Sequence, residues 1–176
     1  EDLAVHVLLD ASGSMGWGED AAHKWTYARR LAAALGYVAL TSGDRLTVQT
    51  LGRQPVRFGP TRGRAQVLRF FQWIETLPAS GVTDLNADLR AYANGTYANG
   101  AYAIGGGRPG LVLLLSDFFS PTGATDGLTA LLGRGHEVTA LHLLSTDEVD
   151  PPLGGDLRLR DVETGAEQEV TIDAAL

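Results

Sequence analysis

Short apolar runs alternate along this chain with longer segments in which apolar residues recur every three or four positions. The runs predict strands at residues 5–9, 45–51, 56–58, 111–115 and 138–144. The longer segments predict helices with apolar faces in residues 28–39, 67–77, 85–93 and 128–132. This alternation is typical of an α/β protein whose mostly parallel sheet is flanked by helices.

Turn residues refine this outline. Gly43 is placed to end the first helix in a left-handed cap, and Pro78 is placed to end the second. The short connection at residues 52–55 predicts an antiparallel hairpin between the second and third strands. Residues 157–162 and 168–172 predict a closing C-terminal β-hairpin. We expect the doubly wound strand order, in which the first and fourth strands are adjacent.

Composition excludes several functions. A chain of 176 residues with 44% hydrophobic content is long enough for one domain with its own core. A net charge of -7 argues against nucleic acid or an anionic membrane surface as the main partner. No cysteine is present, so disulfides and thiolate sites are excluded. No apolar stretch approaches the roughly 20 residues of a membrane-spanning helix.

The chain begins at Glu1, and the first predicted strand follows almost at once. We therefore expect residues 1–176 to be a single domain cut from a longer protein. Lys24 is the only lysine among many arginines, which is in keeping with a GC-rich bacterial genome. The expected location is the bacterial cytoplasm, with a membrane tether, if any, in regions outside this chain.

The segment that follows the first predicted strand carries the strongest chemical signal. Asp10, Ser12 and Ser14 lie at positions i, i+2 and i+4 where the chain leaves the strand. At this spacing the three side chains fall on one side of the backbone and converge. A carboxylate and two hydroxyls make an oxygen-only site that suits Mg²⁺.

Two further oxygen ligands are predicted from neighbouring loops, because carboxyl ends of parallel strands share one edge of the sheet. Thr83 lies on a tight loop before a helical segment, and Asp117 follows the strand at residues 111–115. With Asp10, Ser12 and Ser14 they give two carboxylates and three hydroxyls. This set neutralises a divalent cation and leaves a coordination position for water or an outside carboxylate.

Each residue also has a structural alternative. Ser12 and Ser14 are compatible with an ordinary turn, Thr83 with a helix cap, and Asp117 with a cap of the turn before Pro121. Asp84 is assigned to capping. The glycine-rich stretch at residues 13–18 lacks a phosphate-loop lysine, which argues against a nucleotide site.

Other aromatic and histidine residues are assigned structural or surface roles. The histidines, at positions 6, 23, 136 and 142, lack metal-ligand spacing. Trp25 and Trp73 are predicted to be core or helix-packing residues, whereas Trp17 is predicted to flank the metal. The near repeat at residues 92–102 is predicted to be a loop insertion without chemistry, at the opposite end of the sheet from the metal.

The metal segments together resemble a known family. The Asp-x-Ser-x-Ser segment, the Gly-x-Thr-Asp-Leu loop at residues 81–85 and the Ser-Asp pair after the fourth strand resemble the metal-ion-dependent adhesion site of von Willebrand factor A domains. Their order and spacing match over nearly the whole chain. The chain is most similar to the bacterial group called domain of unknown function 58. That likeness lies in residues 27–35, 42–45, 135–138, 155–159 and 163–165.

The resemblance implies a Rossmann-like three-layer sandwich with Mg²⁺ or Mn²⁺, in preference to Ca²⁺, as cofactor. It implies that an Asp or Glu of a partner protein completes the metal shell. Ser12, Ser14 and, in an open form, Thr83 would bind the metal directly, whereas Asp10 and Asp117 often act through water. Met15, Trp17 and Phe118 are predicted to form the partner-binding rim around the site; we call these residues the rim.

The resemblance also implies a partner. Proteins of this group are associated with MoxR-type AAA+ ATPases, which are thought to act as chaperones in the maturation of protein complexes. The alternative function is a metal-dependent hydrolase or phosphatase that uses Asp10 or a metal-bound water as nucleophile. Such an enzyme needs a general base or a basic residue. We expect the loops around the site to supply neither His nor Lys, so the sequence favours a binding module.

Overall fold

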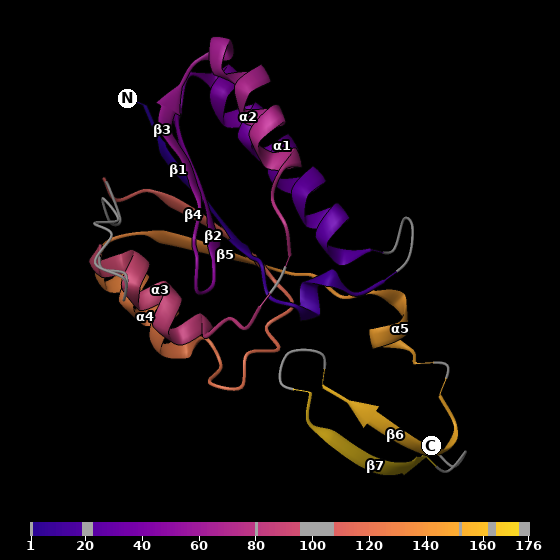
Figure 1. The fold of residues 1–176 in the computed structure, drawn as a ribbon. Helices are drawn as coiled ribbons and strands as arrows, with labels where there is room; N and C mark the ends of the chain where they lie inside the picture. Colours follow the sequence, from indigo (N-terminus) through magenta and orange to yellow (C-terminus); the bar gives the residue numbers. More distant parts are fainter. Residues whose placement is uncertain are drawn as a thin grey trace.

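The computed structural model describes residues 2–18, 23–79, 81–95, 108–151, 153–161 and 165–172. Its central sheet has five strands in the order β3-β2-β1-β4-β5, and only the edge strand β3 runs antiparallel (Figure 1). The strands are β1 (Ala4–Asp10), β2 (Arg45–Leu51), β3 (Arg57–Arg62), β4 (Leu111–Ser116) and β5 (Glu137–His142). The predicted α/β class and the adjacency of the first and fourth strands are confirmed.

Two helix layers enclose this sheet. The helices α1 (Lys24–Ser42) and α2 (Val67–Glu75) cover one face, and α3 (Leu85–Asn94) and α4 (Thr125–Gly133) cover the other (Figure 1). The strand β1 is buried along its whole length because helices cover both of its faces. Its Val7 and Leu9 pack in the α1/α2 core and Leu8 packs in the α3/α4 core. The three-layer sandwich is confirmed.

Helix ends follow the predicted signals. Gly43 ends α1 with a φ of 84°, the left-handed conformation that glycine adopts without strain. Asp84 caps α3, where its side chain accepts a hydrogen bond from the backbone N–H of Ala87 at 3.0 Å. The structural assignment of Asp84 is therefore confirmed.

The histidine at position 6 also has a structural role. Its Nδ1 is hydrogen-bonded to the Tyr92 hydroxyl at 2.7 Å, and its Nε2 to the backbone oxygen of Arg108 at 3.1 Å. Burial lowers the pKa of His6 to about 4.

The prediction that Tyr92 and Ala93 face inward from the third helix is confirmed, because both are buried in α3, which extends to Asn94. The predicted insertion therefore cannot begin at Tyr92. Residues 96–107 of that segment lie outside the described residues.

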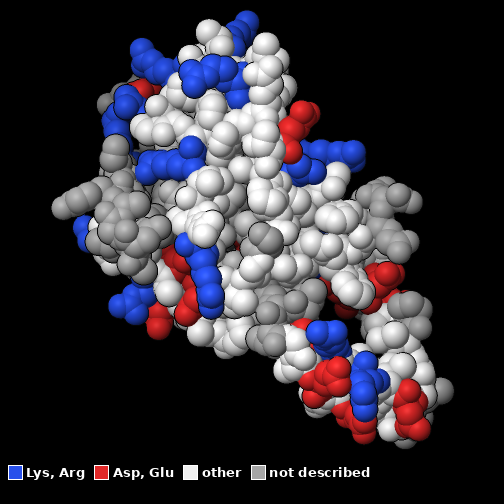
Figure 2. All heavy atoms as spheres, in the orientation of Figure 1, with Lys and Arg blue, Asp and Glu red and all other residues white. Residues whose placement is uncertain are grey.

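The C-terminal hairpin is present as predicted. Its strands β6 (Gly155–Arg160) and β7 (Glu167–Ile172) pair antiparallel in a separate sheet (Figure 1). Acidic and basic side chains lie together on its surface (Figure 2). Arg158 bridges Glu167 and Glu169 across the two strands.

One short helix was not predicted. The helix α5 (Thr146–Val149) follows β5 and begins with a capping box between Ser145 and Glu148. A helix of four residues is too short for apolar periodicity to reveal it, although the Ser-x-x-Glu spacing is a recognisable start signal. No helix among the described residues combines the length and apolar character that crossing a bilayer requires.

Candidate metal-ion site

The candidate site lies at the carboxyl edge of the sheet, where β1 and β4 end side by side. The chain leaves β1 toward α1 on one face and leaves β4 toward α4 on the other, which makes this a crevice where ligands bind in open α/β sheets. The predicted ligands Asp10, Ser12, Thr83 and Asp117 are all at most 3% exposed, and Ser14 is partly buried.

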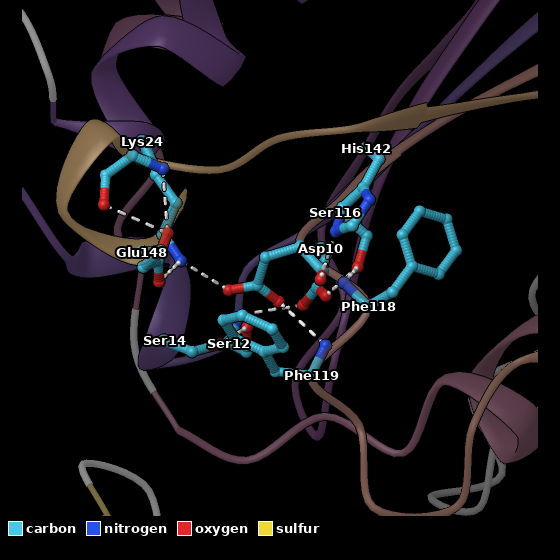
Figure 3. Close-up of polar contacts among 11 residues, drawn as sticks. Asp10, Ser12, Ser14, Lys24, Ser116, Phe118, Phe119, His142 and Glu148 are labelled. Carbon is cyan, nitrogen blue, oxygen red and sulfur yellow. Dashed lines mark hydrogen bonds and ion pairs between the residues drawn. The ribbon is translucent and has the colours of Figure 1, made fainter. Parts of the chain in front are cut away.

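Asp10 is held from two directions. Its Oδ1 accepts a hydrogen bond from the backbone N–H of Ser12 at 3.0 Å, and its Oδ2 accepts one from the Ser116 hydroxyl at 2.5 Å (Figure 3). Burial raises the pKa of Asp10 despite these hydrogen bonds, and the negative charge of Asp117 adds to the rise. Ionised Asp10 is therefore under electrostatic strain that a nearby cation would relieve.

The two serines converge as predicted. The hydroxyl oxygens of Ser12 and Ser14 lie 2.9 Å apart in a hydrogen bond (Figure 3). The Gly13 N–H donates to the backbone oxygen of Gly81 at 2.8 Å, which ties this loop to the one that carries Thr83. A Cβ atom at Gly52 would lie 3.5 Å from the Thr83 hydroxyl oxygen, an ordinary contact distance, so Thr83 lies directly beside the end of β2.

Asp117 forms an ion pair with Lys24, a residue that was not predicted to lie at the site. Its Oδ2 accepts a hydrogen bond from the Lys24 ammonium at 2.7 Å, and its Oδ1 accepts one from the Phe119 N–H at 3.2 Å. The backbone oxygen of Asp117 is also hydrogen-bonded to His142 Nε2 at 3.0 Å. Lys24 belongs to α1 and His142 to β5, so the site has a Lys and a His beside it although the loops themselves supply neither.

The reason for this miss is geometric. Lys24 is the first residue of α1, and the β1-to-α1 connection returns that helix start to the carboxyl edge of the sheet. The topology gives a reason to look for side chains there, but the sequence alone does not show that this particular side chain turns inward. Residues 19–22 of the connection lie outside the described residues.

The predicted rim is only partly at the surface. Trp17 is 52% exposed and Phe118 is partly buried, but Met15 is fully buried in the core. Met15 therefore cannot contact a partner in this conformation. Phe119 is 53% exposed, and its ring centroid lies 5.2 Å from the Lys24 nitrogen. Phe119 is thus an exposed aromatic next to Asp117 that the sequence analysis did not select.

Phe118 has an unusual backbone. Its φ is 58°, a left-handed conformation that bulky residues rarely adopt. The Phe118 N–H donates to the Ser116 hydroxyl oxygen at 2.9 Å, and its ring packs edge-on against His142 (Figure 3). These contacts hold the turn that carries Asp117 beside Asp10.

The donor set fits a hard divalent cation. Buried carboxylates and converging hydroxyls are the oxygen ligands that such ions prefer. Within the described ranges, no three His, Cys, Asp or Glu side chains gather as a metal-binding group. An ion here would therefore depend on the hydroxyls of Ser12, Ser14 and Thr83 and on water as much as on Asp10 and Asp117.

A further carboxylate adds to the negative field. Asp88 lies one turn into α3, and its Oδ2 is buried with no hydrogen-bond partner among the described residues. Burial raises the pKa of Asp88 to about 6, with further contributions from the charges of Asp84 and Asp10. Its ionised form at neutral pH therefore lowers the stability of the metal-free protein.

The substitution Asp88→Asn is expected to stabilise the metal-free protein at neutral pH. The folded-state pKa of Asp88 lies above its ordinary value of 3.8, so its ionisation lowers the free energy of unfolding as pH rises through about 6. The variant has no carboxylate to ionise at this position. Its free energy of unfolding above pH 7 should therefore be about 1–2 kcal/mol higher than that of the wild type, after discounting for partial exposure. Urea unfolding at several pH values measures the gain, which should disappear near pH 4. A pH-independent difference between the two proteins would contradict this role.

Known proteins of similar sequence and structure support the assignment of the fold. One relative, the uncharacterized protein Rv1480 of Mycobacterium tuberculosis, is 29% identical over 176 residues, which are 99% of this chain and 53% of that protein. The chain thus spans about half the length of the curated relatives it matches. An aerotolerance-related membrane protein from Bacteroides fragilis matches with a TM-score of 0.62 at 16% identity, covering 98% of this chain and 83% of that one.

A second solved structure of similar fold contains a bound metal. The proximal thread matrix protein 1 of the mussel byssus, with zinc in its metal-ion-dependent adhesion motif, matches with a TM-score of 0.58 at 19% identity. The match covers 79% of this chain and 37% of that one. The fold is therefore that of a von Willebrand factor A-like domain. The family model "Protein of unknown function DUF58" matches residues 1–176, and the chain belongs to that family.

Proposed function

We propose that this domain is a divalent-metal-dependent protein interaction module that binds an acidic side chain of a partner protein. The observation that carries the proposal is that buried Asp10 lies beside the paired hydroxyls of Ser12 and Ser14, at the edge of the sheet where β4 also ends. The proposed ligands Thr83 and Asp117 come from the loop tied to this segment through Gly13 and Gly81 and from the residue after β4. The zinc-containing adhesion motif of the mussel protein supports a metal-dependent role for such an edge. Mg²⁺ and Mn²⁺ are the proposed ions because the donors are all oxygen.

The proposed ligands have two different roles at the metal site. Ser12, Ser14 and Thr83 would offer neutral hydroxyl oxygens, and Asp10 and Asp117 would supply the balancing charge, in part through water. When bound, a divalent ion supplies the electrophilic centre that an outside carboxylate recognises. Because three of the five donors are uncharged, the site keeps enough positive potential to attract that carboxylate.

The surface around the site offers additional contacts for a partner. The exposed rings of Trp17 and Phe119 lie beside the ligands in sequence. A pocket next to the Asp10–Ser12 segment is lined by Ala11, Gly52, Arg53 and Val82, among others. Arg53 at this pocket suits a second acidic group on the partner. We therefore expect the partner segment to carry aromatic or apolar residues beside its metal-binding Asp or Glu.

A pull-down from the native host tests this function. Immobilised domain with Mg²⁺ should retain a protein that EDTA releases and that the Asp117→Ala domain does not retain. Mutation of acidic residues in that protein should abolish capture. Retention that is unchanged by EDTA and by Asp117→Ala would contradict the proposal.

A MoxR-type AAA+ ATPase is the proposed partner, either bound directly or as a member of the same complex. This follows from the family to which the chain belongs and from the association of that group with such ATPases in assembly or maturation of other complexes. The proposed setting is the bacterial cytoplasm, with any membrane tether in other parts of the parent protein. Co-purification of the full parent protein with the ATPase, with and without EDTA, tests this step.

A metal-dependent hydrolase is the second candidate, and one observation favours it. Lys24 supplies the basic residue at the site that such chemistry needs, although its ammonium is paired with Asp117 and Glu148. The binding module remains the first candidate because the two solved structures compared above are named as a matrix protein and a membrane protein, and neither name describes an enzyme. Steady metal-dependent turnover of a phosphoester, lost in Asp10→Ala, would reverse the order of the two candidates.

A further inference from the structure

The only lysine of the chain is buried at the candidate metal site. Lys24 is 2% exposed, and its ammonium lies 2.7 Å from Oδ2 of Asp117 and 2.6 Å from Oε1 of Glu148 (Figure 3). A buried ammonium is stable only when it is paired and hydrogen-bonded. These two carboxylates provide that pairing.

The second carboxylate is itself fixed in place. Oε2 of Glu148 accepts hydrogen bonds from the backbone N–H of Ser145 at 2.8 Å and from the Ser145 hydroxyl at 3.1 Å. Its Oε1 remains directed at Lys24. The capping box of α5 therefore orients Glu148, and the ion pairs join the start of α1, the end of β4 and α5.

Charge balance gives these contacts a role in ion binding. The carboxylates of Asp10, Asp117 and Glu148 and the ammonium of Lys24 sum to two negative charges, to which ionised Asp88 adds at neutral pH. Without Lys24 the same group would carry three. A fixed positive charge this close to the site opposes a second cation, and Glu148 offsets part of that opposition.

The pairing also affects how Asp117 can act. Its Oδ2 accepts from Lys24 and its Oδ1 accepts from the Phe119 N–H, so both carboxylate oxygens already have donors. Each of these oxygens keeps a second acceptor site, so an ion beside Asp117 would share the carboxylate with Lys24. Lys24 therefore competes with the ion for the charge of this carboxylate.

We propose that Lys24 is a built-in counter-charge of the metal site, which neutralises Asp117 in the metal-free protein and, together with Glu148, sets the affinity for the divalent ion. This inference rests on the proposed metal-dependent function. It predicts that substitutions which change the charge at positions 24 and 148 shift metal affinity in opposite directions.

Calorimetric titration of the domain with MgCl₂ and MnCl₂ provides the test, with folding checked by circular dichroism. Lys24→Met should tighten binding about tenfold, and Glu148→Gln, whose amide preserves the cap of α5, should weaken it about threefold or more. The double variant restores the charge sum and should bind within about threefold of the wild type. Lys24→Arg keeps the charge and should stay within about threefold as well.

A matched control comes from the same turn of α5. Asp147 is exposed in the first turn, and Asp147→Asn makes the same charge change without touching Lys24. Its effect on metal affinity should be less than about twofold because solvent screens it. Lys24→Met should also have a lower melting temperature in EDTA, because it leaves Asp117 buried and unpaired.

The outcomes separate this inference from the function on which it rests. If wild-type protein shows no binding of either metal, the proposed function fails. If wild-type protein binds but Lys24→Met binds equally or more weakly, or the double variant stays far from the wild type, Lys24 only positions Asp117 and the counter-charge is refuted. If Lys24→Met does not fold, Glu148→Gln provides the test, and an unchanged metal affinity in that variant refutes the counter-charge role of Lys24.

Discussion

The substitution Asp10→Asn is expected to abolish measurable binding of Mg²⁺ and Mn²⁺ without lowering the stability of the metal-free protein. Asp10 supplies one of the two carboxylates at the site, and its removal leaves a hard cation without adequate charge compensation. Burial raises the pKa of Asp10, so the ionised side chain is unfavourable in the metal-free fold. An amide of the same shape relieves that cost.

Two measurements on the same variant check this prediction. Wild-type protein should give a calorimetric binding signal and a melting temperature that rises with added metal, whereas Asp10→Asn should give neither. The melting temperature of the variant in EDTA should equal or exceed that of the wild type. Asp126→Asn, an exposed change in the first turn of α4, should behave like the wild type in both assays. Metal affinity in Asp10→Asn within about tenfold of the wild type would contradict the site.

The substitution Ser116→Ala is expected to produce the second-largest effect. The Ser116 hydroxyl is fully buried, donates to Oδ2 of Asp10 at 2.5 Å and accepts from the Phe118 N–H at 2.9 Å. Its loss leaves two buried polar groups unpaired, which costs about 1–3 kcal/mol of stability. It also frees the Asp10 carboxylate, a proposed metal ligand, to rotate. Loss of such a supporting contact lowers metal affinity by roughly 10- to 100-fold.

A matched change four residues along the chain separates these two effects. Ser120 uses its hydroxyl to accept a hydrogen bond from the Leu85 N–H at 3.2 Å and is also hydrogen-bonded to the Thr122 hydroxyl, not to Asp10. Ser120→Ala should reduce the melting temperature but leave metal affinity near the wild-type value. Calorimetry on both variants, with urea unfolding in EDTA, gives the comparison. Equal losses of metal affinity in the two variants would show that Ser116 does not support Asp10 specifically.

Much of the fold could be predicted because its strongest signals are local. β1 is a run of apolar residues because it is covered on both faces, and the left-handed cap at Gly43 follows from backbone sterics. The end of β3 was harder to place. That strand continues through Gly59 and Pro60 to Arg62, and proline is tolerated there because β3 is an edge strand.

The candidate site was predictable to the extent that its ligands directly follow strands. Asp10, Ser12, Ser14 and Asp117 could be found because the chain leaves β1 and β4 at the same edge. Lys24 and Glu148 could not, because they come from the start of α1 and from a helix of four residues. Only the folded structure shows that both side chains turn toward Asp117. The prediction that Met15 belongs to the rim was wrong because a residue next to the proposed ligands in sequence can still be buried in the core.

The most direct test of the account is a crystal structure of the domain grown with MnCl₂, with manganese located by its anomalous scattering. We expect one peak at the carboxyl edge of the sheet within coordination distance of the Ser12 and Ser14 hydroxyls, with Asp10 and Asp117 alongside. That peak should be absent from Asp10→Asn crystals grown in the same solution. A wild-type structure with no manganese at this edge, and with Ser12 still hydrogen-bonded to Ser14, would contradict the central claim.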